Sequence, residues 1–347
     1  MASHSGAAPA PARRFRILTT DQLTNRLPEL VDVTWFDMRA TSRPDRVRRL
    51  LGLIARARGY DALLSFNPGI EMTVVAFLVR VLSGHRTFVV FFDPLLHQPN
   101  NLKDQLATWA KRRLFWGVDK FFCVHKDTSG YEKYYGITQR KWHYVPFKPN
   151  NLQLRSQFNS IDGDYALSCG ASYRDFATLI EAVAGLGYPT RILLPSSRVA
   201  RFHHTELNEA GLPANVKVIR HDFDRTSWNS QIANARLVVI PILKRALQPA
   251  GISVYLESMA LGKPVIISEG ASTIGLLTDK QASIVPAEEP GALAAALKHL
   301  WEDKAARGAI AKGGQDYALS LGGEERLVRD LLEGIYGYLE DRRSRSA

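Results

Sequence analysis

Short apolar runs alternate with helical patterns along nearly the whole chain, and this alternation limits the fold more than any other feature. The runs carry few polar interruptions, which is typical of parallel strands buried on both faces. Strands that alternate with helices predict a doubly wound α/β architecture. The expected strands are 16–19, 31–36, 62–65, 87–92, 120–124, 142–145, 165–168, 190–194, 216–219, 237–240, 264–267 and 282–285. The expected helices include 46–57, 71–82, 102–116, 178–186 and 254–260.

A linker is predicted directly after the sixth of these strands, where Pro146 and Pro149 are followed by Asn150 and Asn151. Two Rossmann-like domains joined at this point would face each other across a cleft, with ligands at the carboxyl ends of their strands. The predicted organisation is a disordered leader (1–14), an N-terminal domain (15–148), a C-terminal domain (149–322), a helix that packs back on the N-terminal domain (323–341) and a tail (342–347).

The composition excludes several other classes of protein. Two cysteines, Cys123 and Cys169, are too few for a disulfide scaffold, and no Cys or His spacing matches a structural zinc site. The first residues lack the apolar core of a signal peptide, and no run of about 18 apolar residues is present to span a membrane. We therefore expect a cytoplasmic protein, either free or peripheral on the inner face of the cytoplasmic membrane.

The net charge of +11 comes from the first part of the sequence. Residues 1–150 carry 23 Lys and Arg against 12 Asp and Glu, whereas residues 151–347 carry 22 of each. Such an excess indicates either an anionic partner, for example a membrane surface, or only a well-solvated face. Nucleic acid is not expected as a partner, because no basic motif with interleaved aromatic residues is present.

The segment 241–268 has the pattern of a site for a nucleotide diphosphate. After an expected strand and a loop, a helix is expected to begin near Gly251, with Ser253 as its N-cap. The free N–H groups of Gly251, Ile252 and Ser253, together with the helix dipole, favour an anion. Glu257 follows about one turn later, where a carboxylate is suited to hold a ribose diol.

These residues resemble the C-terminal domain of GT-B glycosyltransferases, most closely the retaining family-4 (group 1) type. The family pattern E-P-F-G-x4-E-A-M-A-x-G-x-P-V-I is similar to Gln248–Gly251 followed by Leu256–Ile266. Arg174–Ala182 resembles the family's K-G-x-x-T-L-I-E-A helix start, and Leu293–Leu297 resembles its L-A-x-A-I helix. The resemblance implies an α/β GT-B fold, in which two Rossmann-like domains face each other across a cleft, and an enzyme that uses a nucleotide sugar.

The chain departs from the family pattern at three places. Pro249 occupies the position of the first Glu in the family's Glu-x7-Glu motif, and Gln248 is the nearest polar substitute. Ala171 follows Gly170 in the first C-terminal loop, where the family has an Arg. The segment 19–25 lacks the Gly-Gly loop that packs against the donor phosphates in the family. The first departure leaves the identity of the transferred sugar open.

The resemblance also implies further donor contacts. Arg174 is in register with the family's phosphate-binding lysine, although arginines near helix starts are also common on surfaces. Lys244 or Arg245 would supply the second cation, unless both are ordinary loop charges. His221 would lie beside the nucleotide base, unless it is simply a hydrogen-bonded loop residue.

The resemblance assigns acceptor binding to the N-terminal half. Asn67 and Glu71 lie at an expected strand–turn–helix corner, although Glu71 also suits the first turn of a helix without any ligand. Asp93 directly follows a buried strand and either contacts the acceptor or the sugar or caps the strand end. His97 follows on the same loop. Asp93, His97 and Arg174 are the expected catalytic residues.

The segment 102–116 combines apolar and basic residues at helical spacing. Leu102, Leu106, Trp109 and Trp116 recur on one face, and the basic residues around them are Lys103, Lys111, Arg112 and Arg113. Such a helix either lies at a membrane interface or packs into the core with a solvated basic face.

We therefore predict a glycosyltransferase of the hexosyltransferase type, retaining by resemblance, with a nucleotide diphosphate sugar as donor and UDP favoured over GDP. The expected acceptor is a lipid-linked or cell-envelope glycan bound by the basic N-terminal half. No cofactor or metal is expected to be required, because helix amides and Arg174 would stabilise the diphosphate. The alternatives are an inverting transferase or one acting on a soluble natural product, and a GT-B-shaped nucleotide-binding protein without transferase activity.

Overall fold

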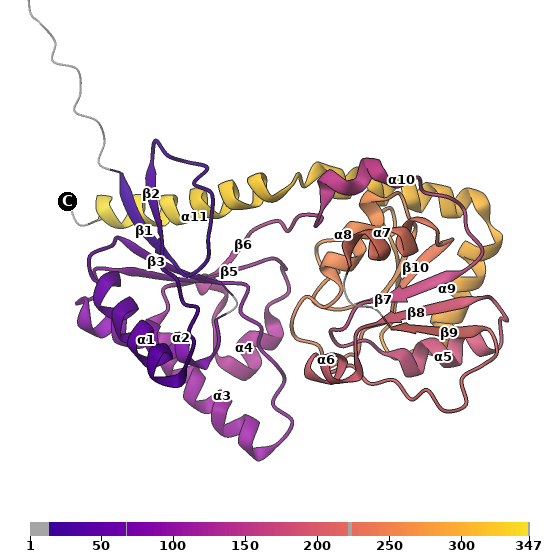
Figure 1. The fold of residues 1–347 in the computed structure, drawn as a ribbon, viewed down its shortest axis with the longest axis horizontal. Coiled ribbons are helices and arrows are strands. Elements are labelled where there is room, and N and C mark those ends of the chain that lie inside the picture. The colour runs from indigo at the N-terminus through magenta and orange to yellow at the C-terminus, as the bar shows by residue number, and fades with distance from the viewer. Residues whose placement is uncertain (1–13, 67, 221–223, 346–347) are drawn as a thin grey trace, which may run out of the picture. The chain divides into compact units, whose positions relative to one another are not determined.

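The computed structural model describes residues 14–66, 68–220 and 224–345, and Figure 1 shows their fold. The described strands form two six-stranded sheets. In spatial order, the first sheet contains β2 (Val31–Trp35), β1 (Phe15–Thr19), β3 (Ala62–Phe66), β4 (Phe88–Phe92), β5 (Lys120–Cys123) and β6 (Trp142–Tyr144). The second sheet contains β12 (Ser283–Val285), β11 (Val265–Ser268), β10 (Leu237–Ile240), β7 (Ala166–Cys169), β8 (Thr190–Leu194) and β9 (Val216–Arg220).

Helices connect most of these strands. The α-helices are α1 (Arg43–Ala57), α2 (Ile70–Leu82), α3 (Leu102–Leu114), α4 (Ser129–Tyr135), α5 (Phe176–Ala184), α6 (Ser197–Phe202), α7 (Arg225–Ala233), α8 (Ile252–Ala260), α9 (Pro290–Glu302), α10 (Lys304–Ser320) and α11 (Glu324–Ser344). Short 3₁₀ helices are η1 (Phe115–Gly117), η2 (Gln139–Lys141) and η3 (Leu152–Gln157). No helix within the described ranges is both long and apolar enough to cross a membrane.

In both sheets the chain first moves outward in one direction and then reverses to the other side of its first strand, which confirms the predicted doubly wound α/β architecture. In the first sheet the chain moves from β1 outward to β2 and then returns to β3 on the other side of β1. In the second sheet it moves from β7 outward through β8 and β9 and then returns to β10 on the other side of β7. Open α/β sheets bind ligands at the carboxyl edge where the strand order reverses. The loops that follow β1, β3, β7 and β10 are therefore the places for sites.

The described chain separates into two compact units. The first unit comprises the described residues up to Pro94, Ala110–Phe122 and those from Val328 onward. The second unit comprises Leu95–Trp109 and Cys123–Leu327. The domain boundaries expected from the sequence stay predictions.

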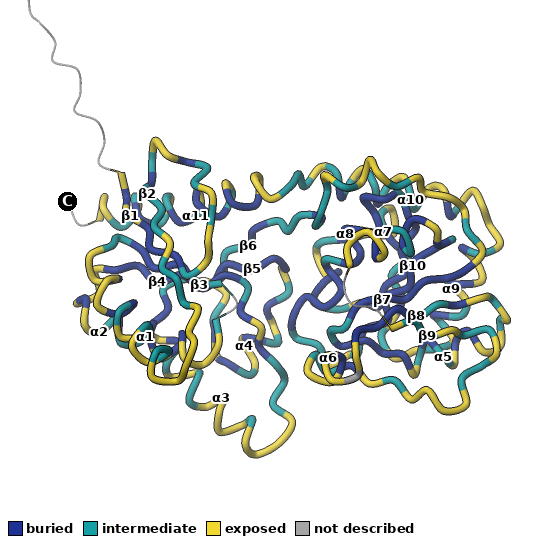
Figure 2. Tube along the Cα trace, viewed as in Figure 1, coloured by how far each residue is buried: buried dark blue, intermediate teal, exposed yellow. Residues whose placement is uncertain are grey.

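The second unit has packed layers on both faces of its sheet. On one face, α5 and α9 bury leucines such as Leu179, Leu293 and Leu297 against the strands. On the other face, α8 packs against β10 and β11, and α10 packs against α8. Figure 1 shows α5 and α8 on opposite sides of this sheet, and Figure 2 shows β7, β8 and β10 as buried chain. A buried core therefore holds the strand ends that carry the candidate site.

In the first unit, α1 and α2 lie on one face of the sheet and the second half of α11 lies on the other (Figure 1). The Tyr336 ring meets Phe15 edge-on at 5.7 Å, and the Tyr338 ring stacks on Phe88 at 5.9 Å. The helix continues to Ser344, whereas the sequence predicts a tail from residue 342. Arg343 donates a hydrogen bond to Glu340 Oε2 at 2.8 Å, and cations favour the last turn of a helix.

Several predictions fall on residues that the structure does not describe. These are the leader before Arg14, the acceptor residue Asn67, the base-binding residue His221 and the last two residues of the tail.

Candidate functional site

The candidate site of the second unit lies where β7 and β10 end. Gly170 follows β7 with a φ of +103°, and Gly251 precedes α8 with a φ of +89°. Both values lie in the left-handed region that glycine adopts without steric cost. A Cβ on Gly251 would lie 2.9 Å from Ile240 Cγ2, and a Cβ on Gly170 would overlap the Arg174 guanidinium. Both positions therefore require glycine for backbone conformation and for space.

The N-terminus of α8 offers fewer free donors than the sequence predicts. The helix begins at Ile252 with Gly251 as its N-cap, so Ser253, the expected N-cap, is instead its second residue. Helical geometry starts directly after the left-handed glycine. The Ile252 N–H, expected to be free, donates to Pro249 O at 3.3 Å because the preceding loop turns tightly. Across the described ranges, no hydrogen bond uses the N–H groups of Gly251 and Ser253, and these remain for an anion.

Arg174 lies across the end of β7. Its Nε donates to Cys169 O at 2.9 Å and its Nη1 donates to Ser172 O at 2.8 Å. A backbone bridge joins Arg174 to Ile242, which follows β10. The side chain is fixed by the backbone of its own loop, and that loop is tied to the loop that leads to α8.

Arg174 is a buried cation, with only 2% of its surface exposed. Burial lowers its pKa to about 10, so it stays charged at neutral pH. Within residues 14–66, 68–220 and 224–345, no carboxylate pairs with it, and its Nη2 donates no hydrogen bond. Buried charges in proteins are nearly always paired. The pairing that Arg174 lacks would be supplied by a bound anion.

Glu257 is buried in the second turn of α8. Its Oε2 accepts a hydrogen bond from Trp228 Nε1 on α7 at 2.9 Å. Its Oε1 is buried, accepts no hydrogen bond from the described residues and lies 3.8 Å from Arg225 Nη1. Burial raises the pKa of Glu257, whereas the Trp228 N–H, the Asn150 side chain and the charges of Arg225 and Lys148 lower it. The carboxylate is therefore oriented by Trp228 and keeps one oxygen for a ligand hydroxyl.

Arg174 and Glu257 converge on the same strand end. Burial raises the pKa of the Cys169 thiol, in the last position of β7, to about 12. The Arg174 charge lowers that pKa and the Glu257 charge raises it. The Arg174 side chain lies at the end of β7 beside Gly170, and Glu257 lies on α8, which follows β10, so both belong to the switch point of the second sheet.

Gln248 is buried in the loop before Gly251, and its side-chain Oε1 has no partner among the described residues. Its backbone oxygen accepts a hydrogen bond from Ala250 N at 2.7 Å, which fixes the loop. Buried polar atoms without a partner are uncommon. The sequence singles out Gln248 only as the polar residue nearest to the missing Glu, and its burial becomes visible only in the fold.

The two candidate loop cations have different surroundings. Lys244 is exposed, and its backbone N–H donates to Glu288 Oε1 at 2.9 Å. Arg245 is also exposed. Burial raises the pKa of Tyr173 to about 12 and lowers that of His204, and the Arg245 charge lowers both. The Arg245 charge therefore acts on Tyr173 and His204, and the Lys244 backbone lies beside Glu288.

His97 is held within the second unit by aromatic neighbours. Its Nδ1 lies 2.8 Å from Tyr173 Oη, and its backbone oxygen accepts a hydrogen bond from Tyr135 Oη at 2.8 Å. Its ring is 4.7 Å from the His204 ring. The expected catalytic histidine thus belongs to the cluster near Arg245.

The first unit contains the remaining predicted residues. Asp93 follows β4 with a φ of +48°, and its Oδ1 is buried without a hydrogen bond from the described chain. Burial raises the pKa of Asp93 to about 6. Its N–H, rather than its carboxylate, continues the sheet by donating to Phe122 O at 2.8 Å, so the side chain does not cap the strand end. Glu71 on α2 accepts hydrogen bonds from Arg46 Nε at 2.7 Å and forms an ion pair with it.

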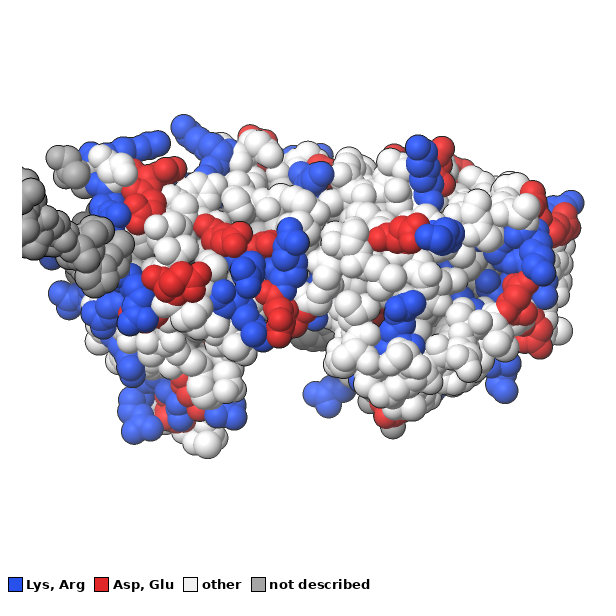
Figure 3. Space-filling model, turned by 90° about the horizontal axis from the view of Figure 1, so that it is seen from above, with Lys and Arg blue, Asp and Glu red and all other residues white. Residues whose placement is uncertain are grey.

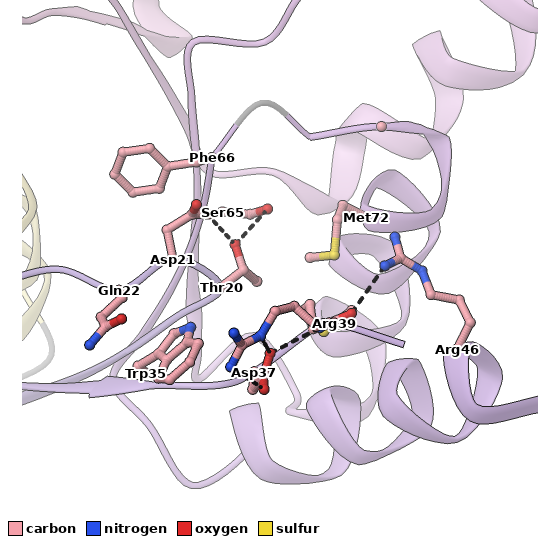
Figure 4. A pocket seen from close by; sticks show the side chains of 12 residues that line it. Thr20, Asp21, Gln22, Trp35, Asp37, Arg39, Arg46, Ser65, Phe66 and Met72 are labelled. Carbon is pink, nitrogen blue, oxygen red and sulfur yellow. Dashed lines mark hydrogen bonds and ion pairs between the residues drawn. The ribbon is translucent and has the colours of Figure 1, made fainter. Parts of the chain in front are cut away.

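Sequence reasoning missed Trp228, which orients Glu257. No local signal identifies it, because the contact joins two helices whose residues are 29 positions apart. It also missed a pocket in the first unit, lined by Trp35 and Asp37 among others (Figure 4). The described ranges contain no group of three or more His, Cys, Asp and Glu side chains that could hold a metal ion.

Comparisons with known proteins agree with this geometry. Residues 179–303 match the family model described as glycosyl transferases group 1. HepE of Anabaena, solved in complex with UDP-glucose, has a TM-score of 0.66 at 15% identity, with 93% of this chain and 100% of that chain covered. A glycosyltransferase from Rickettsia africae has a TM-score of 0.64 at 10% identity, with 94% and 98% covered. Sucrose-phosphate synthase from Thermosynechococcus elongatus has a TM-score of 0.63 at 16% identity, with 96% and 89% covered. No curated protein matches the chain.

The predicted GT-B fold is confirmed by these structural neighbours. The family model confirms the predicted resemblance to group 1 glycosyltransferases over 179–303, the region that contains α8 and Glu257. Together they support a glycosyltransferase.

Proposed function

We propose that this GT-B chain transfers a sugar from a nucleotide diphosphate donor, UDP in preference to GDP, to a glycan acceptor. The observation that carries the proposal is Arg174, a buried cation without an acidic partner at the switch point of the second sheet. A diphosphate would supply that partner and would accept hydrogen bonds from the N–H groups of Gly251 and Ser253. The UDP-glucose complex of the structural neighbour HepE supports UDP as the nucleotide.

The other residues of the cluster have matching roles. Glu257 Oε1 would accept a hydrogen bond from a ribose hydroxyl, and the Gln248 side chain would contact the transferred sugar in place of the absent Glu. Negative charge grows on the diphosphate as its bond to the sugar breaks, and Arg174 with the two amides would stabilise it. We expect transfer to need no metal and to retain the anomeric configuration.

Asp93 and His97 remain proposed catalytic residues, Asp93 as a contact to the acceptor or the sugar, and Lys244 remains a proposed donor contact.

Binding of uridine and of UDP separates the two main roles. Glu257→Gln removes charge from the ribose contact, so it is expected to weaken uridine and UDP alike by about tenfold to hundredfold. Arg174→Lys keeps the charge but loses the planar fork, so it is expected to weaken UDP by a similar factor and leave uridine unchanged. Titration calorimetry measures both ligands on all variants.

Glu289→Gln is the matched control, because Glu289 is an exposed residue of the same unit that caps no helix through its side chain. It is expected to bind both ligands as the unaltered chain does. If Glu257→Gln binds uridine and UDP with the same affinities as the Glu289→Gln control does, the donor site lies elsewhere. UDP binding without transfer or hydrolysis of UDP-sugars would instead favour a nucleotide-binding protein. Activity in the presence of EDTA tests metal independence, and NMR of the product tests retention.

The acceptor part of the proposal, a lipid-linked or envelope glycan reached from a membrane surface, rests on α3. Its apolar side chains are not core residues: Leu102 is 77% exposed, Leu106 69% and Trp109 57%. Figure 2 shows most of α3 as exposed chain. The alternative that this face packs into the core is therefore wrong. Lys and Arg side chains spread over the surface of the first unit in Figure 3, and apolar residues flanked by cations suit an anionic lipid surface.

A further inference from the structure

The first unit has a pocket of about 490 Å³ at the carboxyl edge of its sheet (Figure 4). Its walls come from the last residues of β2 and β3, from the residues that follow β1, β2 and β3, and from α1 and α2. β1 and β3 flank the point where the strand order of this sheet reverses. This is the topological counterpart of the candidate donor site between β7 and β10, and its volume falls in the range of small-molecule sites.

The cations of this pocket are already neutralised. Arg39 Nε and Nη2 donate to the two oxygens of Asp37, each at 2.9 Å. Arg46 Nε donates to Glu71 Oε2 at 2.7 Å, and its Nη1 donates to Met38 O at 3.2 Å. Hydrogen bonds from Arg39 hold the pKa of Asp37 at about 2, so this pair stays ionised at neutral pH.

A third carboxylate, Asp21, lines the pocket without a cation among the described residues. Two arginines therefore face three acids once Glu71 is included. A pocket with this balance disfavours a phosphate or another anion. The excess of basic residues, which the sequence associates with the acceptor, does not line this pocket.

The remaining lining groups suit a polyhydroxylated ring. Thr20 Oγ1 lies 3.3 Å from Ser65 Oγ and donates to Asp21 Oδ2 at 3.2 Å, which makes a connected run of hydroxyl and carboxylate oxygens. Trp35, with 37% of its surface exposed, and Phe66 add aromatic surface to the same pocket. The hydroxyls of a sugar can form hydrogen bonds with these hydroxyl and carboxylate oxygens, and its C–H face can pack on the aromatic rings.

We propose that this pocket of the first unit binds a neutral sugar unit, held by the Asp21, Thr20 and Ser65 oxygens and by the Trp35 ring. The assignment of this sugar to the acceptor rests on the transferase function proposed above. Any phosphate or lipid of the acceptor then lies outside the pocket.

A glycan array that carries neutral and acidic glycans tests the proposal on the full chain in the presence of UDP. Binding to at least one neutral glycan is expected, and saturation-transfer NMR with its methyl glycoside then measures affinity. Trp35→Ala is expected to weaken that binding by about tenfold, and Asp21→Asn by a similar factor. The phosphorylated counterpart of the same sugar is expected to bind more weakly than the neutral form.

Trp116→Ala is the matched control, since Trp116 is a half-exposed tryptophan of the same unit that does not line the pocket. It is expected to keep full glycan affinity. The proposal is overturned if no neutral glycan binds, if the phosphorylated sugar binds more tightly, or if Trp35→Ala and Asp21→Asn bind like the control. UDP titration on the same samples separates the outcomes: intact UDP binding without glycan binding refutes this pocket alone, and loss of both refutes the proposed function.

Discussion

Gly251 and Asp93 share a left-handed backbone conformation but differ in what it costs. At Gly251 the conformation is free of strain and lets the start of α8 approach the Ile240 side chain. At Asp93 a residue with a Cβ is held at a φ of +48°, with a carboxyl oxygen buried and unpaired. Strained and unsatisfied groups of this kind are stabilised by the rest of the fold and gather at functional sites.

Gly251→Ala is expected to destabilise the second unit. The added Cβ costs about 1–2 kcal/mol in the left-handed region and about 1–3 kcal/mol from its contact with Ile240. UDP binding should fall as well, because the amide donors at the start of α8 move. Urea denaturation and UDP titration measure the two effects. Gly308→Ala in α10, where a Cβ meets no atom within 4 Å, should instead leave UDP binding intact and stabilise the helix by about 1 kcal/mol.

Asp93→Asn is expected to stabilise the protein at neutral pH. Burial raises the folded-state pKa of Asp93 to about 6 from 3.8, so the folded carboxyl resists ionisation and stability falls as pH rises from 3.8 to 6. By linkage this penalty amounts to about 3 kcal/mol above pH 6. Asparagine tolerates a positive φ and carries no charge to bury. The gain should be largest above pH 6 and disappear near pH 4.

Urea denaturation across this pH range measures the effect as the difference in the free energy of unfolding between Asp93→Asn and the unaltered chain. The difference is needed because burial lowers the pKa of His125 to about 4, which makes the fold lose stability as pH falls from 6.5 to 4. Asp279→Asn, at an exposed carboxylate, should show no comparable gain. A pH-independent difference between Asp93→Asn and the unaltered chain would contradict a buried, neutral carboxyl.

At the scale of elements, α11, the last helix of the chain, packs against strands of the first sheet. The Tyr338 ring lies 5.9 Å from Phe88 and 6.1 Å from Phe122, and Lys120 Nζ lies 4.3 Å above it. These partners belong to β4 and β5, in the middle of the first sheet. The last helix is therefore part of the core of the first unit.

Tyr338→Ala is expected to destabilise the first unit by about 2 kcal/mol, since it removes two ring contacts and a cation–π contact. Hydrogen exchange should become faster in β4 and β5 and stay unchanged in β7 and β10. Phe202→Ala removes an aromatic ring that is 79% exposed, and should change stability by less than about 0.5 kcal/mol. Unchanged exchange in the first sheet would mean that α11 contributes little to its core.

At the scale of the whole molecule, the charge of +11 and the pocket of the first unit are separate features. The cations that line the pocket are paired with Asp37 and Glu71. The exposed apolar face of α3 is accompanied by Lys103, Lys111 and Arg112 on the same helix. The proposed membrane contact therefore rests on α3 and not on the cations of the pocket.

Vesicle co-sedimentation tests this arrangement. Binding to phosphatidylglycerol-containing vesicles is expected at low salt and should fall at high salt, because screening shortens the Debye length from about 10 Å at 0.1 M to about 3 Å at 1 M. The pair Leu102→Ser and Leu106→Ser should weaken binding. Val47→Ser with Leu51→Ser, a pair of similar exposure on α1, is the control. Equal binding to pure phosphatidylcholine would show that the positive charge does not drive membrane binding, and no binding to either vesicle would argue for a soluble acceptor.

The sequence by itself indicated the strands, the doubly wound architecture and the candidate donor segment around Gly251 and Glu257, whose donor role stays a prediction. These follow from local patterns, since apolar runs and glycines act over a few positions. Contacts between distant residues were decided only by the tertiary structure. Trp228 orients Glu257 and Glu71 neutralises Arg46 through such contacts. Within the described ranges, the fold also buries Arg174 without bringing an acidic side chain to it. Burial and pairing depend on which chain segments meet at a strand edge, and local sequence does not encode that proximity.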